Sequence, residues 1–190
     1  MIRGINSAAV AILALAGIAA VASTAAAEVY HSRESALTLA FGDGARVETR
    51  ELFLSSEEQS AASRNAGSEI PSRLVRRYTG HRGVQLVGYV YFETHQVRSL
   101  PETLMIVLTP GGTVASVHVL AFHEPEAYLP HENFLRQFSG AGLDAELSLR
   151  TGIQGIAGST FTANAVTAAV RRVLAIHATV GADDEEGRQP

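Results

Sequence analysis

A segment rich in glycine and hydroxyl residues near the C-terminus is the part of this sequence best suited to chemistry. It contains Gly155, Gly158, Ser159, Thr160 and Thr162, and it runs directly into a helical pattern. The first N–H groups of a helix have no intrahelical acceptor, and the helix dipole favours negative charge at that end. The segment therefore indicates a place where a phosphate group can bind, although a turn that only caps a helix uses the same residue types.

The pattern that follows predicts a helix from residue 161 to about 178, ending before Gly181. Apolar or aromatic side chains recur there at steps of three and four residues. They are Phe161, Ala165, Val166, Ala169, Val170, Val173, Leu174 and His177. The residues off this stripe are Asn164, Thr167, Arg171 and Arg172, and we expect the two arginines on a solvated face, with one of them reaching an anionic partner as the alternative.

Histidines and hydroxyls elsewhere give weaker indications. His118 and His123 lie on one expected strand and point to opposite faces, while His95 and His131 are expected in separate loops, so no metal site is predicted. No Gly-x-Ser-x-Gly turn precedes the hydroxyl residues, so no catalytic residue is assigned. The sequence His123-Glu124-Pro125 stands where a strand leaves the sheet, either close to a ligand or simply in a turn.

The order of motifs between residues 104 and 176 resembles that of FMN-binding domains, and the likeness extends back to about residue 88. This family includes the flavin-carrying subunits of sodium-pumping NADH:quinone reductase and of Rnf complexes, and small exported single-domain proteins. Its attachment motif, Asp-x-x-(Ser/Thr)-Gly-Ala-(Thr/Ser), corresponds here to residues 154–160. Upstream, a hairpin at Pro110-Gly111-Gly112 leads to His123-Glu124-Pro125, and residues 134–140 resemble the short helix that precedes the attachment turn.

The resemblance implies an FMN cofactor, covalent or tightly bound, whose phosphate is esterified to Thr160 by a separate flavin transferase that uses FAD and a metal ion. It implies that Gly158 lets the backbone approach the phosphate and that Ser159 and Thr162 donate hydrogen bonds to it. Ala157 lies in the same motif, and the resemblance places Glu124 and His123 near the flavin. The implied protein is an electron carrier with an unknown redox partner, for which a membrane-bound protein is one option.

Three residues depart from the family pattern. Gln154 replaces the acidic residue, Ala157 replaces serine or threonine, and Ser159 replaces alanine and adds a second hydroxyl beside Thr160. These changes leave non-covalent FMN open, and also a flavin-free periplasmic binding or assembly module of the same fold. A flavin-dependent reductase is a further alternative. The absence of a dinucleotide-binding Gly-x-Gly-x-x-Gly motif from the sequence argues against it.

Composition limits the class of protein. The 190 residues suit one domain, and 19 acidic against 15 basic residues, with no arginine patch interleaved with aromatics, argue against a nucleic-acid partner. No cysteine is present, which excludes haem c attachment, iron–sulfur clusters and disulfides. Residues 1–27 read as a signal peptide cleaved near Ala27, predicting an exported or periplasmic protein, with an uncleaved membrane anchor as the alternative.

The remaining pattern predicts an α+β domain with a mostly antiparallel sheet flanked by helices. We expect residues 28–87 to form its N-terminal helix and strand portion and residues 181–190 a disordered acidic tail, and the resemblance implies that residues 88–180 are an FMN-binding core with an FMN-binding-domain-like fold. We expect helices at 31–40 and 55–67, and strands at 46–54, 74–79, 84–94, 104–108 and 114–122. In the strand at 84–94, Leu86, Val90 and Phe92 should share one face and Val87, Tyr89 and Tyr91 the other.

Overall fold

One antiparallel sheet organises the chain. The computed structural model describes residues 28–29 and 32–186, so the predicted signal peptide and the last four residues of the predicted tail lie outside the described residues. The strands are β1 (Glu28–Val29), β2 (Arg46–Phe53), β3 (Leu74–Arg82), β4 (Gln85–Gln96), β5 (Pro101–Leu108) and β6 (Val114–Phe122), in the spatial order β1-β6-β5-β4-β3-β2. The expected α+β class, with an antiparallel sheet flanked by helices, is confirmed.

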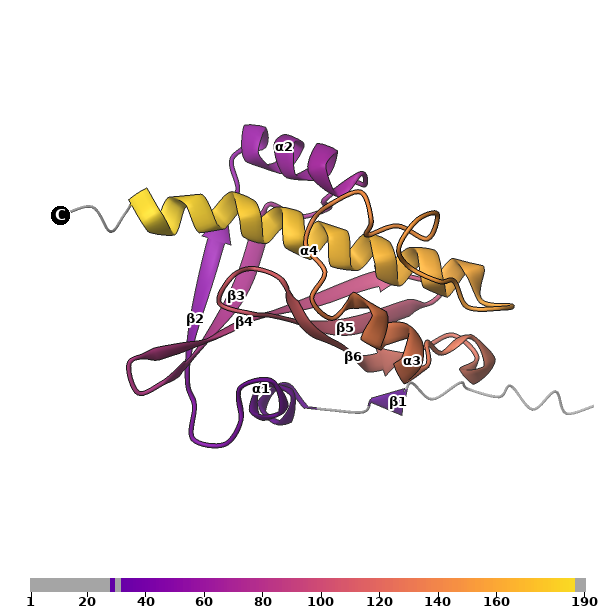
Figure 1. The fold of residues 1–190 in the computed structure, drawn as a ribbon, viewed down its shortest axis with the longest axis horizontal. Coiled ribbons are helices and arrows are strands. Elements are labelled where there is room, and N and C mark those ends of the chain that lie inside the picture. Colours follow the sequence, from indigo (N-terminus) through magenta and orange to yellow (C-terminus); the bar gives the residue numbers. More distant parts are fainter. Residues whose placement is uncertain (1–27, 30–31, 187–190) are drawn as a thin grey trace, which may run out of the picture.

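The helices divide between the two faces of the sheet. They are α1 (Arg33–Phe41), α2 (Ser56–Ala66), the 3-10 turn η1 (Glu126–Tyr128), α3 (Glu132–Leu135), the 3-10 turn η2 (Arg136–Phe138) and α4 (Thr160–Glu186). Figure 1 shows α4 lying along the sheet with α2 beside it. The main core joins Ile106 of β5, Val170 of α4 and Ala62 of α2, while Phe41 of α1 packs with Val90 and Met105 on the opposite face.

Local sequence signals explain where the two N-terminal helices begin. Ser55 and Glu58 form a capping box, in which the N–H of Glu58 donates to Ser55 Oγ and the N–H of Ser55 donates to the Glu58 carboxylate. Gly67 ends α2 in a left-handed conformation, and Ser32 caps α1. Small alanine side chains on α2 and α4 let these two helices pack closely against each other. Helix α4 packs on the sheet, and α2 packs on α4.

A β-bulge in β4 changes the expected alternation. Gly80 pairs with Gly88 and His81 with Leu86, so Val87 is an extra residue in β4. Only glycine fits at position 88, where φ is 154° and an added Cβ would lie 2.3 Å from the carbonyl oxygen of Leu108. Val87 consequently packs with the α1-side cluster, and the prediction that it shares a face with Tyr89 and Tyr91 is wrong.

Two element boundaries also differ from the predictions. β4 continues to Gln96 and β5 begins at Pro101, so His95 lies in a strand opposite Glu102 and not in a loop. Helix α4 runs past Gly181 to Glu186, so its predicted end before Gly181 is wrong. A single glycine costs a helix only about 1 kcal/mol, and the buried Val180 keeps this part of α4 on the protein.

Several side chains of α4 do not lie where the apolar stripe in the sequence predicted them. Phe161 is 62% exposed, whereas Thr167 is buried and donates its hydroxyl to the carbonyl of Ala163. Arg172 forms an ion pair with Glu93 of β4, its Nη2 lying 2.6 Å from a carboxylate oxygen. Arg171 is not on a solvated face either, because its guanidinium reaches the backbone of two other segments.

Arg171 connects α4 to α2 and to the long loop before α4. It donates to the carbonyls of Asn65 and Ala66 at the end of α2, and to those of Asp144 and Leu147 in the loop. These carbonyls include the last ones of α2, which lack intrahelical donors. One guanidinium therefore holds three segments together.

We expect Arg171→Ala to lower the free energy of unfolding by about 2 kcal/mol, because it removes several charge-assisted hydrogen bonds to backbone carbonyls. Urea denaturation followed by circular dichroism measures the change. Arg150→Ala, which removes an exposed arginine from the same loop, is the matched control and should change stability by less than about 0.5 kcal/mol. Equal losses in the two variants would contradict this role for Arg171.

Candidate functional site

The start of α4 is fixed by two buried hydroxyl groups. Thr162 Oγ1 donates to the carbonyl of Tyr128 over 2.8 Å, and Ser159 Oγ donates to that of Ala127 over 3.5 Å. Ser159 is 5% exposed and Thr162 is 1% exposed. The sequence singled out both residues as hydrogen-bond donors to a phosphate, but in this structure both hydroxyl protons are given to the backbone of η1. They position the helix end.

Thr160, between these two residues, is exposed. It is the first residue of α4, so its neighbouring backbone N–H groups belong to the turn that lacks intrahelical acceptors. Gly158, two residues earlier, has a φ of 78°, a left-handed conformation that glycine adopts without strain. The chain thus presents one accessible hydroxyl at the positive end of a long helix.

A hollow of about 140 Å³ lies beside this turn. It is lined by Val97, Arg98, Glu124, Tyr128, Gly158, Ser159, Phe161 and Thr162. The fold thereby brings Glu124, from the end of β6, to the residues that the sequence singled out around 158–162. Ala157, Thr160 and His123 do not line the hollow, although Ala157 and Thr160 are exposed next to it.

A second hollow of about 310 Å³ is also bordered by Phe161. It shares Val97 and Phe161 with the first, and it continues to His95 and Arg172. We call the two hollows together the α4 groove. Cofactor sites usually occupy about 300–1,000 Å³, a range that the groove reaches. It is formed by the first turns of α4 and the end of β4.

Sequence reasoning missed Phe161 and Arg98 as groove residues. Phe161 fitted the apolar stripe of the helix and was expected in the core, but it stands exposed with the Arg98 guanidinium 5.6 Å from its ring centroid. A signal was available, because an aromatic residue in the first turn directly after the candidate anchor is well placed to stack on a planar ligand. Arg98 and Val97 carried no signal, since the turn that places them was not predicted.

The carboxylate of Glu124 holds that turn in place. Its Oε1 accepts hydrogen bonds from the backbone N–H groups of Ser99 (2.7 Å), Leu100 (2.8 Å) and Arg98 (3.2 Å). The hydrogen bonds from Ser99 and Leu100, followed by that from Arg98, lower the pKa of Glu124 below its usual range. Glu124 is therefore occupied in shaping the wall of the groove.

His123 turns away from the groove, toward β5. Its Nδ1 lies 3.1 Å from the carbonyl oxygen of Pro101, and its backbone N–H donates to the same oxygen. Of the two residues that the sequence associated with a flavin at this strand end, Glu124 lines the groove and His123 does not.

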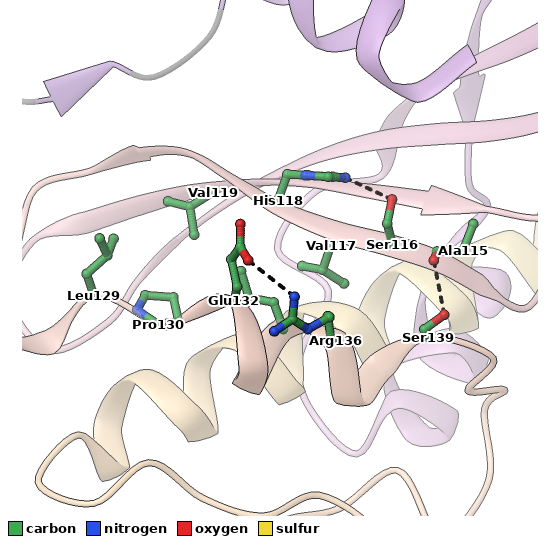
Figure 2. A pocket seen from close by; sticks show the side chains of 11 residues that line it. Ala115, Ser116, Val117, His118, Val119, Leu129, Pro130, Glu132, Arg136 and Ser139 are labelled. Carbon is green, nitrogen blue, oxygen red and sulfur yellow. Dashed lines mark hydrogen bonds and ion pairs between the residues drawn. The ribbon is translucent and has the colours of Figure 1, made fainter. Parts of the chain in front are cut away.

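A larger cavity, of about 670 Å³, lies elsewhere. It is bounded by Ala115–Val119 of β6 and by the segment from Leu129 through α3 to Ser139. Figure 2 shows Ser116 and His118 on the β6 side and the ion pair of Glu132 with Arg136 on the α3 side. None of the residues singled out from the sequence around 154–162 lines this cavity. We therefore regard the smaller α4 groove as the candidate site, because the chemistry-bearing residues meet there.

No protein-family model matches the chain, and comparison with curated proteins also finds no match. Within residues 28–29 and 32–186, no group of three His, Asp or Glu side chains is arranged to hold a metal ion. No helix in the described part of the chain is long and apolar enough to cross a membrane. What this protein does is therefore inferred from its own residues and from the resemblance of its motifs.

We expect Glu124→Gln to lower stability by about 1–2 kcal/mol near pH 7, because hydrogen bonds to a carboxylate are roughly twice as strong as those to a neutral amide. The carboxylate's pKa is lowered in the folded protein, so its contribution is present above the unfolded pKa and is lost as the pH falls through the folded pKa. The difference between the two proteins should therefore shrink below about pH 4.

Urea denaturation at a series of pH values measures this difference. Glu126→Gln, which changes an exposed carboxylate two residues away, is the control and should leave stability nearly unchanged at each pH. A stability difference for Glu124→Gln that stays constant from pH 7 to pH 3 would show that the negative charge is not what holds the turn.

Proposed function

We propose that this protein is an exported electron-transfer flavoprotein of the FMN-binding-domain family, whose FMN is joined by a phosphoester to Thr160 and lies along the α4 groove. The observation that carries the proposal is the exposure of Thr160 at the start of α4, between two buried hydroxyl residues. The resemblance of residues 154–160 to the family's attachment motif points to the same residue.

The accessibility of the three hydroxyl groups favours Thr160 over its neighbours. An attachment enzyme needs a hydroxyl that it can reach, and Ser159 and Thr162 are buried with their protons donated to Ala127 and Tyr128. Ser159, the second hydroxyl that departs from the family pattern, is thus a poor competitor. The exposed positions of Gln154 and Ala157 leave the rest of the motif accessible to the same enzyme.

The residues around Thr160 fit a phosphate with a planar ring attached. Free N–H groups of the first turn and the helix dipole suit the phosphate. The exposed ring of Phe161 and the guanidinium of Arg98 offer flat surfaces for stacking. The two hollows that Phe161 borders offer FMN a path along the first turns of α4.

FMN, the protein chain and two other proteins each contribute to the proposed function. FMN, when bound, supplies the one- and two-electron redox chemistry that the side chains of this chain lack. The chain anchors the phosphate, orients the ring and excludes water from one side of it. Maturation requires a flavin transferase, with which Thr160 Oγ1 replaces AMP at the FMN phosphorus of FAD, and electron transfer requires an external redox partner.

We expect protein co-expressed with a flavin transferase to gain the mass of one FMN less one water, and to be yellow after removal of free flavin. Thr160→Val removes the hydroxyl with little change in shape and should abolish the mass increase. Thr160→Ser, the matched control that keeps a hydroxyl on the same residue, should keep it. Intact-mass spectrometry and flavin fluorescence of the denatured protein measure the result, and the same spectrum shows whether residues 1–27 have been removed.

Each of the other outcomes indicates a different anchor residue, mode of flavin binding or function. A mass increase that survives Thr160→Val but is lost in Ser159→Ala moves the anchor to Ser159. Yellow colour without a mass increase indicates non-covalent FMN. A protein that stays colourless and unmodified is the flavin-free binding module, and steady NAD(P)H oxidation by the isolated protein indicates the reductase.

A further inference from the structure

A row of polar side chains lies between β4 and α4, under the groove. Alternate residues of β4 face the helix. The hydroxyl of Tyr91 lies 2.9 Å from Nδ1 of His177, and the carboxylate of Glu93 accepts from Arg172. His95 is the next residue on this face, and it lines the larger hollow of the groove together with Arg172.

His95 forms a buried pair with Glu102. The two residues face each other across β4 and β5, with Nε2 of His95 3.1 Å from Oε2 of Glu102. The side chain of Glu102 is fully buried and that of His95 is 8% exposed. Burial raises the pKa of the Glu102 carboxyl, an effect that its hydrogen bond to His95 partly offsets.

The second polar atom of each partner is not hydrogen-bonded. Among the described residues, neither Oε1 of Glu102 nor Nδ1 of His95 has a partner, and both atoms are buried. An unsatisfied buried polar atom costs about 1–3 kcal/mol. On the opposite face of the same two strands, Thr94 and Thr103 satisfy each other at 3.0 Å. These two atoms, a basic ring nitrogen and a carboxyl oxygen, are the positions of the pair at which a further proton can bind.

The charged and titratable groups around the pair come from three elements. Glu93 precedes it on the same face of β4, and Arg172 of α4 is already bound to Glu93. His123, just after β6, contacts the carbonyl of Pro101, the residue before Glu102. Because Arg172 is paired with Glu93, its positive charge does not fully compensate a negative charge on the His95–Glu102 pair.

We infer that the His95–Glu102 pair is a proton-uptake site at the floor of the α4 groove, which gains a proton at Nδ1 of His95 when a negative charge is placed in the groove. The inference rests on the proposed function, since reduction of a bound flavin by an external electron donor is what adds the charge. The step begins from the form of the pair that holds a single proton between Nε2 of His95 and Oε2 of Glu102, at net charge −1. A proton from solvent forms the new N–H bond at Nδ1 and brings the pair to zero, while the electrons remain on the cofactor.

Proton uptake and reduction must then favour each other equally, because coupling between two sites is reciprocal. We expect the reduced form to bind the proton about tenfold more tightly, which corresponds to about 30 mV for a two-electron couple. The midpoint potential of the bound flavin should therefore rise as the pH falls through the titration of the pair. His95→Gln should flatten this rise, and His131→Gln, an exposed histidine, should not.

A second measurement needs no flavin. Nitrogen NMR of the histidine rings in the flavin-free protein should show His95 with its proton on Nε2 at high pH and a second proton arriving at Nδ1 as the pH falls. Glu102→Gln should weaken that second proton about tenfold, since it removes the negative partner. The wild-type titration can be measured even if a variant fails to fold.

The outcomes separate this inference from the proposed function. A yellow protein whose potential depends on pH equally in wild type and His95→Gln overturns the inference and leaves the flavoprotein intact. A protein that takes up no FMN overturns the proposed function and with it the redox role of the pair. If His95 keeps one unchanging protonation state across the pH range, the pair is not a proton site in either case.

Discussion

The attachment of the N-terminus of α4 to η1 is the interaction on which the candidate site depends. Two short side chains, Ser159 and Thr162, donate to consecutive carbonyls and so fix both the position and the rotation of the helix end. The two residues between them, Thr160 and Phe161, point elsewhere, which is why Thr160 is accessible. The same rotation turns Phe161 outward, so these two hydrogen bonds set the exposure of both Thr160 and the aromatic ring that borders the groove.

The opposite wall of the groove is held by a different kind of interaction. A single carboxylate, that of Glu124, gathers three backbone N–H groups and thereby orders the turn that carries Val97 and Arg98. The two walls come from segments far apart in the sequence, and they meet only because β6 ends beside the β4–β5 turn. Beneath them, the polar row of β4 replaces the apolar contacts that a helix on a sheet normally makes.

Much of the fold could be predicted from the sequence because its signals are local. The capping residues Ser55 and Glu58, the alternation along β2 and the apolar run of β5 each depend on neighbouring residues alone. The errors arose where distant contacts decide. The bulge at Gly88 places Val87 on the opposite face of the sheet from the one expected. Packing of Val180 extends α4 beyond Gly181. Arg171, which the sequence pattern placed on a solvated face, instead binds the carbonyls of α2.

The candidate site follows the same division. The turn at 158–162 and the strand end at Glu124 could be singled out from the sequence, because glycine, hydroxyl and acidic residues are recognisable without knowledge of the fold. It could not show which of three hydroxyls is exposed, since this depends on the carbonyls of Ala127 and Tyr128. Nor could it pair His95 with Glu102, because that requires the register of β4 against β5.

The guanidinium of Arg171 has a consequence for how the molecule opens. It ties the loop that leads to Thr160 both to α2 and to the middle of α4, so this loop cannot peel away without disturbing two helices. Segments joined in this way tend to unfold as one cooperative unit. Under the proposed function, an enzyme that modifies Thr160 would meet an already folded surface and would have to recognise its shape as well as its sequence.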